Sequence, residues 1–84
     1  MEVKFFNATW CGPCKQMKPH ISKLQKEGYN IQEIDIDQNS TLAESAEIRG
    51  VPTLAIYENG NEVERLVGYE DYDRLKARID IFKK

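Results

Sequence analysis

The spacing of hydrophobic and polar residues changes several times along this chain, and each change predicts a new element of secondary structure. Between Val3 and Phe6, apolar side chains fall on both faces of an extended segment, which predicts a short strand at the centre of a sheet. From Cys11 to about Glu27, apolar residues recur at helical spacing, and Gly28 is a typical stop signal. The segment Ile31 to Ile36 predicts a second strand. A strand, a helix and a strand joined by a crossover indicate a parallel pair with a right-handed connection.

The middle of the chain predicts a short helix followed by a hairpin. The helix is expected from Ser40 to about Glu47, with Ser40 as its N-cap. A strand from Thr53 to Glu58 then leads into Asn59-Gly60, the strongest hairpin signal of the sequence. This dipeptide predicts a type I′ turn and a return strand from Glu62 to Val67.

The last predicted element is a helix capped by Asp71, after Gly68 has ended the preceding strand. Its apolar stripe consists of Tyr72, Leu75, Ile79 and Phe82. The order strand, helix, strand, helix, hairpin, helix is typical of an α/β fold with a small mixed sheet. At 84 residues, the whole chain (1–84) is expected to form a single domain with one modest core.

Composition narrows the function classes. The formal net charge is −2 with mixed signs, so no broad basic surface is expected for nucleic acid or anionic lipid. No segment approaches the roughly 20 apolar residues of a membrane span. The start, Met1 to Phe6, has no signal-peptide pattern and already reads as a strand, so the expected location is the cytoplasm. In that reducing compartment a lone Cys-x-x-Cys pair is more often catalytic than structural.

Both cysteines of the chain lie in the segment Trp10-Cys11-Gly12-Pro13-Cys14-Lys15. If a helix begins at residue 11, Cys11 lies in its first turn and Cys14 one turn later on the same face. Unpaired N–H groups at the helix start favour the thiolate of Cys11, which is the nucleophilic form. Gly12 leaves room for an incoming partner, and Pro13 suits an early helical position that needs no N–H.

This arrangement predicts thiol–disulfide exchange, in which Cys11 attacks a partner disulfide and Cys14 resolves the mixed disulfide. A zinc site is an alternative, but it needs four ligands and His20 is the one other nitrogen or sulfur candidate. A structural disulfide is a second alternative, which the small ring and the expected reducing compartment disfavour.

With this motif the chain resembles the thioredoxin family, and the resemblance covers nearly its whole length. The six residues from Trp10 to Lys15 match the thioredoxin active-site motif, and Pro19 falls at the family's helix-kinking proline. Four further segments follow in the family's order and at near-family spacing: Ile36-Asp37-Gln38-Asn39, Arg49-Gly50-Val51-Pro52-Thr53-Leu54, Asn59-Gly60 and Val67-Gly68.

The resemblance implies a minimal thioredoxin fold of β-α-β-α-β-β-α order. Its sheet would be mixed and four-stranded, with strand order 2-1-3-4 and three flanking helices. The family's usual first strand and helix have no counterpart in this sequence. The strand Ile31 to Ile36 would then lie at a sheet edge, where its acidic residues discourage pairing with other chains.

The resemblance also implies a partner-binding surface around the two cysteines. Pro52 would follow a cis peptide bond and pack beside the cysteines, and the backbone of Val51 would pair with an extended substrate segment. Trp10 would offer a flat apolar contact surface, and Gly68 would allow close approach of a partner. The substrate-binding residues expected on this basis are Trp10, Gly12, Pro13, Val51, Pro52 and Gly68.

Two positions depart from the family pattern near Cys14. Phe5 stands where thioredoxins usually carry a buried aspartate, and Asn7 stands where they usually carry a tryptophan. An apolar ring near Cys14 disfavours its thiolate, which predicts a slower or differently pH-dependent resolving step. Glu33 is expected to be a solvated strand residue, with a substitute proton acceptor behind Cys14 as the alternative.

The function implied by the resemblance is that of a protein-disulfide reductase with a redox-active Cys11–Cys14 disulfide and no bound cofactor. Its electrons would come from an NADPH-dependent thioredoxin reductase, and its substrates would be disulfide-containing proteins, with ribonucleotide reductase among them. It would act as a cytoplasmic monomer. The alternatives are a glutaredoxin-like dedicated electron donor and a non-catalytic binding subunit with the thioredoxin fold.

Overall fold

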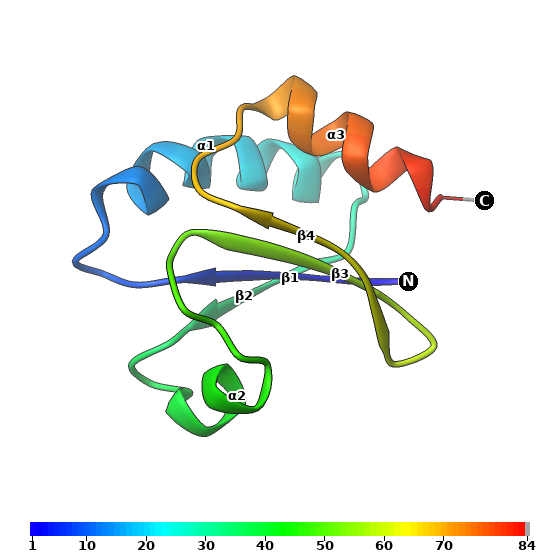
Figure 1. Cartoon of the computed structure of the whole chain (residues 1–84). Coiled ribbons are helices and arrows are strands. Elements are labelled where there is room, and N and C mark those ends of the chain that lie inside the picture. Colours follow the sequence, from blue (N-terminus) through cyan, green and yellow to red (C-terminus); the bar gives the residue numbers. More distant parts are fainter. Residues whose placement is uncertain (84) are drawn as a thin grey trace.

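The computed structural model describes residues 1–83, and these form a four-stranded sheet with three helices (Figure 1). The elements are β1 (Glu2–Asn7), α1 (Gly12–Lys26), β2 (Ile31–Asp35), α2 (Ser40–Ser45), β3 (Thr53–Glu58), β4 (Asn61–Val67) and α3 (Tyr72–Ile81). Their order is the one that the periodicity of the sequence predicts, and the α/β class is confirmed.

The strands lie side by side in the order β2-β1-β3-β4, which confirms the predicted order 2-1-3-4. β1 pairs with β2 in parallel and with β3 antiparallel, and β3 pairs with β4 antiparallel. These directions bring the ends of β1, β2 and β4 and the start of β3 to the same end of the sheet, on the left in Figure 1. Connections that are far apart in the sequence therefore meet there.

The helices cover the sheet unequally. α1 and α3 pack on one face and α2 lies on the other (Figure 1). β1 is central, so it contributes Phe5 to the larger core under α1 and α3 and Phe6 to the smaller core on the α2 face. This explains why the strand is apolar on both faces.

The β3–β4 hairpin turns at Asn59 and Gly60, whose φ angles are 53° and 83°. A type I′ turn needs positive φ at both central positions, and Asn-Gly tolerates this conformation best. The register between the strands shifts between Ile56 and Tyr57, as a β-bulge produces. β4 begins at Asn61, one residue before the predicted Glu62.

The predicted cap of α2 is wrong. Ser40 is the first helical residue, and Asn39 occupies the cap position without a capping side-chain hydrogen bond. The reason is the turn after β2, in which the Asn39 side-chain amide donates to the backbone carbonyl of Asp35 at 3.1 Å. α2 also ends at Ser45, earlier than the predicted Glu47.

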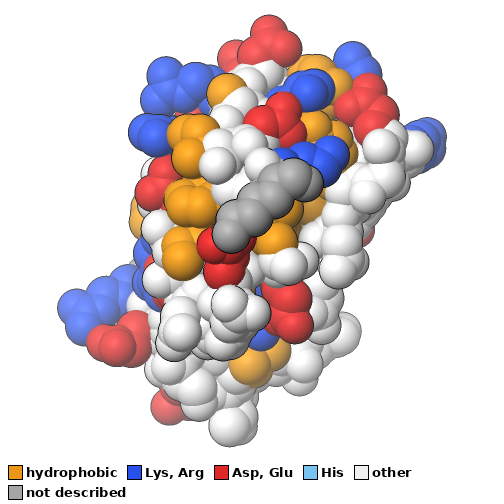
Figure 2. Space-filling model, turned by 90° about the vertical axis from the view of Figure 1, so that its right-hand side faces the viewer, with side chains coloured by type: hydrophobic (Ala, Val, Ile, Leu, Met, Phe, Trp, Pro, Cys, Tyr) orange, Lys and Arg blue, Asp and Glu red, His pale blue; other side chains and the backbone are white. Residues whose placement is uncertain are grey.

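Charges of both signs are distributed over the surface. Figure 2 views the right-hand side of Figure 1 and shows Lys and Arg interspersed with Asp and Glu, so neither sign dominates this face. Within α3, Lys76 pairs with Asp80 at 2.9 Å, and Arg74 of α3 pairs at 3.3 Å with Glu70, which precedes the helix. Within residues 1–83, no helix combines the length and the apolar character that a membrane crossing requires.

Candidate active site at one end of the sheet

Four connections meet at the end of the sheet where β1, β2 and β4 finish and β3 begins. Cys11 follows β1, Asp37 follows β2, Pro52 precedes β3 and Gly68 follows β4. Two backbone hydrogen bonds hold neighbouring connections together. The N–H of Gly68 donates to the carbonyl of Pro52 at 2.9 Å, and the N–H of Ile36 donates to the carbonyl of Asn7 at 2.9 Å.

Cys11 and Cys14 form a disulfide with their Cα atoms 5.3 Å apart. The helix begins at Gly12, so Cys11 is its N-cap and does not lie in its first turn as the sequence predicted. Cys11 has extended backbone angles, and its sulfur accepts the N–H of Cys14 at 3.1 Å. The sulfur therefore occupies the position that a serine or aspartate oxygen takes in an ordinary cap.

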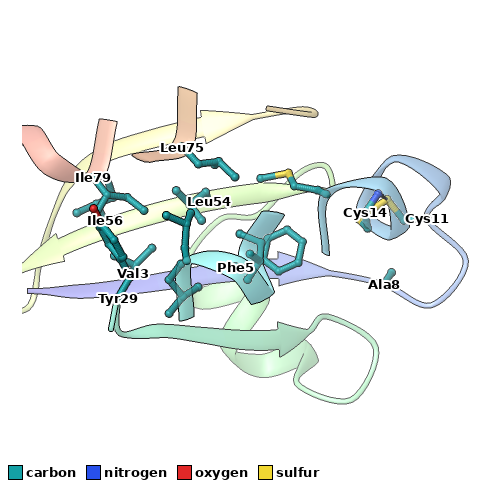
Figure 3. Close-up of a cluster of buried hydrophobic side chains, with 14 residues drawn as sticks. Val3, Phe5, Ala8, Cys11, Cys14, Tyr29, Leu54, Ile56, Leu75 and Ile79 are labelled. Carbon is teal, nitrogen blue, oxygen red and sulfur yellow. Dashed lines mark hydrogen bonds between the residues drawn. A yellow bond between two sulfur atoms is a disulfide. The ribbon is translucent and has the colours of Figure 1, made fainter. Parts of the chain in front are cut away.

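The two sulfurs differ in their surroundings. Cys14 is fully buried in the core under α1 and α3, whereas Cys11 is 4% exposed and borders the exposed residues Trp10, Gly12 and Pro13. Figure 3 shows the disulfide at the edge of this core, with Phe5 and Leu54 farther inside. An approaching partner therefore reaches the Cys11 side first.

Trp10 extends into solvent, with 66% of its surface exposed. Its indole N–H donates to the carboxylate of Asp37 at 2.8 Å, which fixes the ring beside Cys11. In the sequence, Asp37 stands out as part of the family segment Ile36-Asp37-Gln38-Asn39, and this bond was not predicted. The two residues are 27 positions apart on different connections, and no spacing in the sequence links them.

The peptide bond between Val51 and Pro52 is cis, and Pro52 is buried while Val51 is half-buried. Just beyond it, the Thr53 hydroxyl donates to the carbonyl of Gly50 at 2.6 Å and closes the turn that carries both residues. Gly68, which bonds to Pro52, has a φ of 99°, a conformation that other residues rarely adopt.

Phe5 is fully buried and belongs to the same apolar cluster as Cys14 (Figure 3). Glu33 is the partner of Phe5 in the β1–β2 register, but its side chain is exposed and accepts a hydrogen bond from Gln25 at 3.4 Å. This supports the interpretation of Glu33 as a solvated strand residue. Asn7 is buried and donates to the carbonyls of Phe5 and Ile34, both at 3.2 Å, so its amide ties β1 to β2.

A second side-chain pair at this end of the sheet was also missed from the sequence. Tyr69, directly after Gly68, has its hydroxyl 2.9 Å from Nε2 of His20 on α1. From the sequence, His20 was weighed only as a further ligand of the disfavoured zinc site. These residues are 49 positions apart, and neither belongs to an apolar stripe that would have linked them.

An open pocket of about 350 Å³ adjoins the segment before Pro52. Its lining residues are Glu47, Arg49, Gly50, Thr53, Arg65 and Val67. Arg65 donates from Nε to Glu62 at 2.6 Å, and this hydrogen bond raises the pKa of the guanidinium. Among residues 1–83, the His, Cys, Asp and Glu side chains form no group of three that could hold a metal ion.

Comparisons with known proteins agree with this arrangement. A family model described as Thioredoxin matches residues 2–81. The chain is 44% identical over 80 residues to a thioredoxin of Chlamydia pneumoniae, covering 93% of this chain and 78% of that protein. It is 36% identical over 78 residues to a thioredoxin of Staphylococcus aureus, covering 89% and 75% respectively.

Solved structures give the same result. A mutant thioredoxin from Halobacterium salinarum superposes with a TM-score of 0.90 at 38% identity, covering 99% of this chain and 74% of that one. The thioredoxin of Fasciola hepatica superposes with a TM-score of 0.90 at 32% identity, covering 98% and 80%. By these similarities and by its Cys11–Cys14 disulfide, the chain belongs to the thioredoxin family and is a thiol–disulfide oxidoreductase.

Proposed function

We propose that the chain reduces protein disulfides, with Cys11 as the attacking nucleophile and Cys14 as the resolving thiol. The observation that carries this assignment is the position of the disulfide at the N-terminal end of α1, with the N-cap Cys11 on the solvent side and Cys14 in the core. The N–H of Cys14 already donates to the sulfur of Cys11. The same donor and the helix N-terminus stabilise negative charge on that sulfur after reduction.

The reaction proceeds in two exchange steps. In the reduced protein, the Cys11 thiolate attacks one sulfur of the partner disulfide, and the other partner sulfur leaves as a thiolate that takes up a proton. Cys14 then loses its proton and attacks the sulfur of Cys11. This re-forms the Cys11–Cys14 disulfide and releases the second partner sulfur, which ends as a thiol. The partner has then gained two electrons from the cysteine pair and two protons, one from Cys14 and one from solvent, which had taken up the proton of Cys11 when its thiolate formed.

The partner segment lies across the end of the sheet in this proposal. The backbone of Val51, just before β3, pairs with the extended segment through main-chain hydrogen bonds of the kind made in β-augmentation. The cis Pro52 packs beside the disulfide, and the exposed ring of Trp10 supplies apolar contact area. The proposed contact residues are Trp10, Gly12, Pro13, Val51, Pro52 and Gly68.

The family relationship supports a wider setting for this cycle. We infer that an NADPH-dependent thioredoxin reductase regenerates the dithiol and that ribonucleotide reductase is among the disulfide-containing substrates. The protein acts as a monomer in the cytoplasm, where thiols are kept reduced. It needs no bound cofactor, because the cysteine pair itself carries the two electrons.

Cysteine variants test the assignment of roles. Reduced Cys14→Ser protein, mixed with a disulfide protein such as insulin, is expected to accumulate a covalent mixed disulfide through Cys11 that dithiothreitol releases. Cys11→Ser serves as the matched control and is expected to form none. An adduct with Cys11→Ser and none with Cys14→Ser would reverse the two roles. Failure of the reduced parent to lower the insulin disulfide content would refute the proposed reductase activity.

A further inference from the structure

Tyr69 lies one residue beyond the proposed partner-binding surface. It directly follows Gly68, whose N–H donates to the carbonyl of Pro52 at 2.9 Å. Its side chain is 45% exposed, and Val67 on the other side of Gly68 is also exposed. Large apolar side chains in such a position commonly mark a contact surface for another molecule.

The ring of Tyr69 is held in place by α1. Its hydroxyl is hydrogen-bonded to Nε2 of His20 at 2.9 Å, and the two rings meet edge to face with their centroids 6.0 Å apart. Figure 1 shows the connection between β4 and α3 running alongside α1, where this contact forms. This contact lies at the surface and ties the Tyr69 hydroxyl to α1, while much of the Tyr69 ring stays exposed to solvent.

The same arrangement occurs on the other side of the disulfide. Trp10 is exposed, and its polar atom is bonded to Asp37, which follows the edge strand β2. Tyr69 follows the opposite edge strand, β4, so the end of β1 and the start of β3 lie between the two connections that hold these rings. Fixing a ring before binding lowers the entropy lost on contact with a partner.

The backbone near the two rings is open. No non-neighbouring atom lies within 4 Å of the position that a Cβ would take at Gly12 or Gly68. A chain segment can therefore come close to the backbone next to each aromatic side chain. The segment that binds at this surface is the one that flanks the disulfide cysteine of a partner protein, because the surface is continuous with the site formed by Pro52 and Cys11.

We propose that Tyr69 is a specificity residue that binds an apolar side chain next to the disulfide cysteine of a protein substrate, and that His20 is its positioning residue. This inference rests on the proposed function, because it needs a substrate segment that crosses the Cys11 and Pro52 site. It adds a preference among substrates: segments with a large apolar residue beside the cysteine react faster than segments with glycine there.

Two disulfide-bonded peptides, identical except for Leu or Gly next to the attacked cysteine, test the preference. For each peptide, the second-order rate constant of its reaction with the dithiothreitol-reduced protein is measured. The rate constant for the Leu peptide divided by that for the Gly peptide is the Leu/Gly ratio. A general structural defect would slow both reactions equally and leave this ratio unchanged. We expect a ratio of about five to ten for the parent, and close to one for Tyr69→Ala. Ile81→Ala is the matched control, since it removes an exposed apolar side chain of α3 and is expected to keep the parent ratio.

The role of His20 is tested by a double-mutant cycle. Tyr69→Phe and His20→Ala each remove the hydrogen bond and keep the aromatic ring at position 69, so each is expected to lower the Leu/Gly ratio about two- to threefold. The double variant is expected to show no further loss, and His20→Gln, which retains a hydrogen-bonding amide, is expected to recover part of the ratio. Additive effects of the two single changes would overturn the positioning role.

The outcomes separate this proposal from the proposed function. A parent protein that reduces both peptides at equal rates keeps its reductase function, but the specificity site is refuted. A Tyr69→Ala variant that retains the full ratio refutes it as well. A reduced parent that reacts with neither peptide contradicts the proposed function itself.

Discussion

Arg65 joins β4 to the end of α2, close to the segment that leads into Pro52. Its replacement by glutamine tests whether this link stabilises the folded protein. Its guanidinium donates to the carbonyl of Ala46 at 2.6 Å and to that of Glu47 at 3.0 Å. The carboxylate of Glu62 accepts two further bonds, at 2.6 and 2.7 Å, and so orients the group. The carbonyls at the end of α2 have no helical donors, so Arg65 replaces the missing partners.

The expected loss follows from these contacts. Hydrogen bonds that involve a charged group contribute about 1.5–3 kcal/mol each when they are buried. The side chain of Arg65 is 28% exposed, so solvent weakens them, and Arg65→Gln is expected to lower the free energy of unfolding by about 1–2 kcal/mol in total. For a chain of this size, that corresponds to a melting temperature lower by roughly 5–15 °C.

Urea unfolding of the oxidised protein measures this loss, and Arg78→Gln provides the matched control. Arg78 pairs with Glu64 at 3.3 Å on the surface, and its removal is expected to cost no more than about 0.5 kcal/mol. Equal free energies of unfolding for the two variants would show that the contacts of Arg65 with α2 add nothing beyond a surface ion pair. The slope of free energy against urea should stay unchanged, because the same surface is exposed on unfolding.

Two further predictions concern acid stability and the exposed tryptophan. The pKa of Asp80 is lowered in the folded protein, first by the hydrogen bond from Tyr29 and then by Lys76. The Asp80 carboxylate therefore stabilises the fold at any pH above the pKa that this group has in the unfolded chain. This stabilisation is lost as the pH falls through the lower pKa of the folded state. Between roughly pH 5 and pH 2, Asp80→Asn is therefore expected to lose less free energy of unfolding than the parent, and equal losses would contradict this. Trp10 is the single tryptophan, so Asp37→Ala, which removes its hydrogen-bond partner, is expected to lower its fluorescence anisotropy. Glu33→Ala is the control and should leave the anisotropy unchanged.

The architecture could be predicted because its signals are local. The two-sided apolar pattern of β1, the helical spacing in α1 and the Asn59-Gly60 turn each lie within one short segment. The cap of α2 was mispredicted because two local signals compete there. Asn39 belongs to the turn after β2, and its side-chain amide donates a hydrogen bond to the carbonyl of Asp35. Asn39 therefore takes the cap position without capping the helix, and Ser40 becomes the first helical residue.

The cysteine pair could also be predicted, since three positions separate its members. The bonds between Trp10 and Asp37 and between His20 and Tyr69 could not, because they join residues 27 and 49 positions apart. Such contacts depend on which strands end at the same side of the sheet. That information becomes available only once strand order and direction are known.

Phe5 and Cys14 together decide how the proposed cycle handles the proton of the resolving thiol. Both side chains are fully buried in one apolar cluster, and within residues 1–83 the buried polar side chains are those of Asn7 and Thr53, neither of which is a base. The side-chain amide of Asn7 donates to two backbone carbonyls, and Glu33 lies in solvent. In the proposed cycle, Cys14 must therefore lose its proton toward the Cys11 side, to water or to the departing partner thiolate. The rate of resolution then depends on the basicity of the partner's leaving sulfur, a dependence that a buried internal carboxylate would reduce.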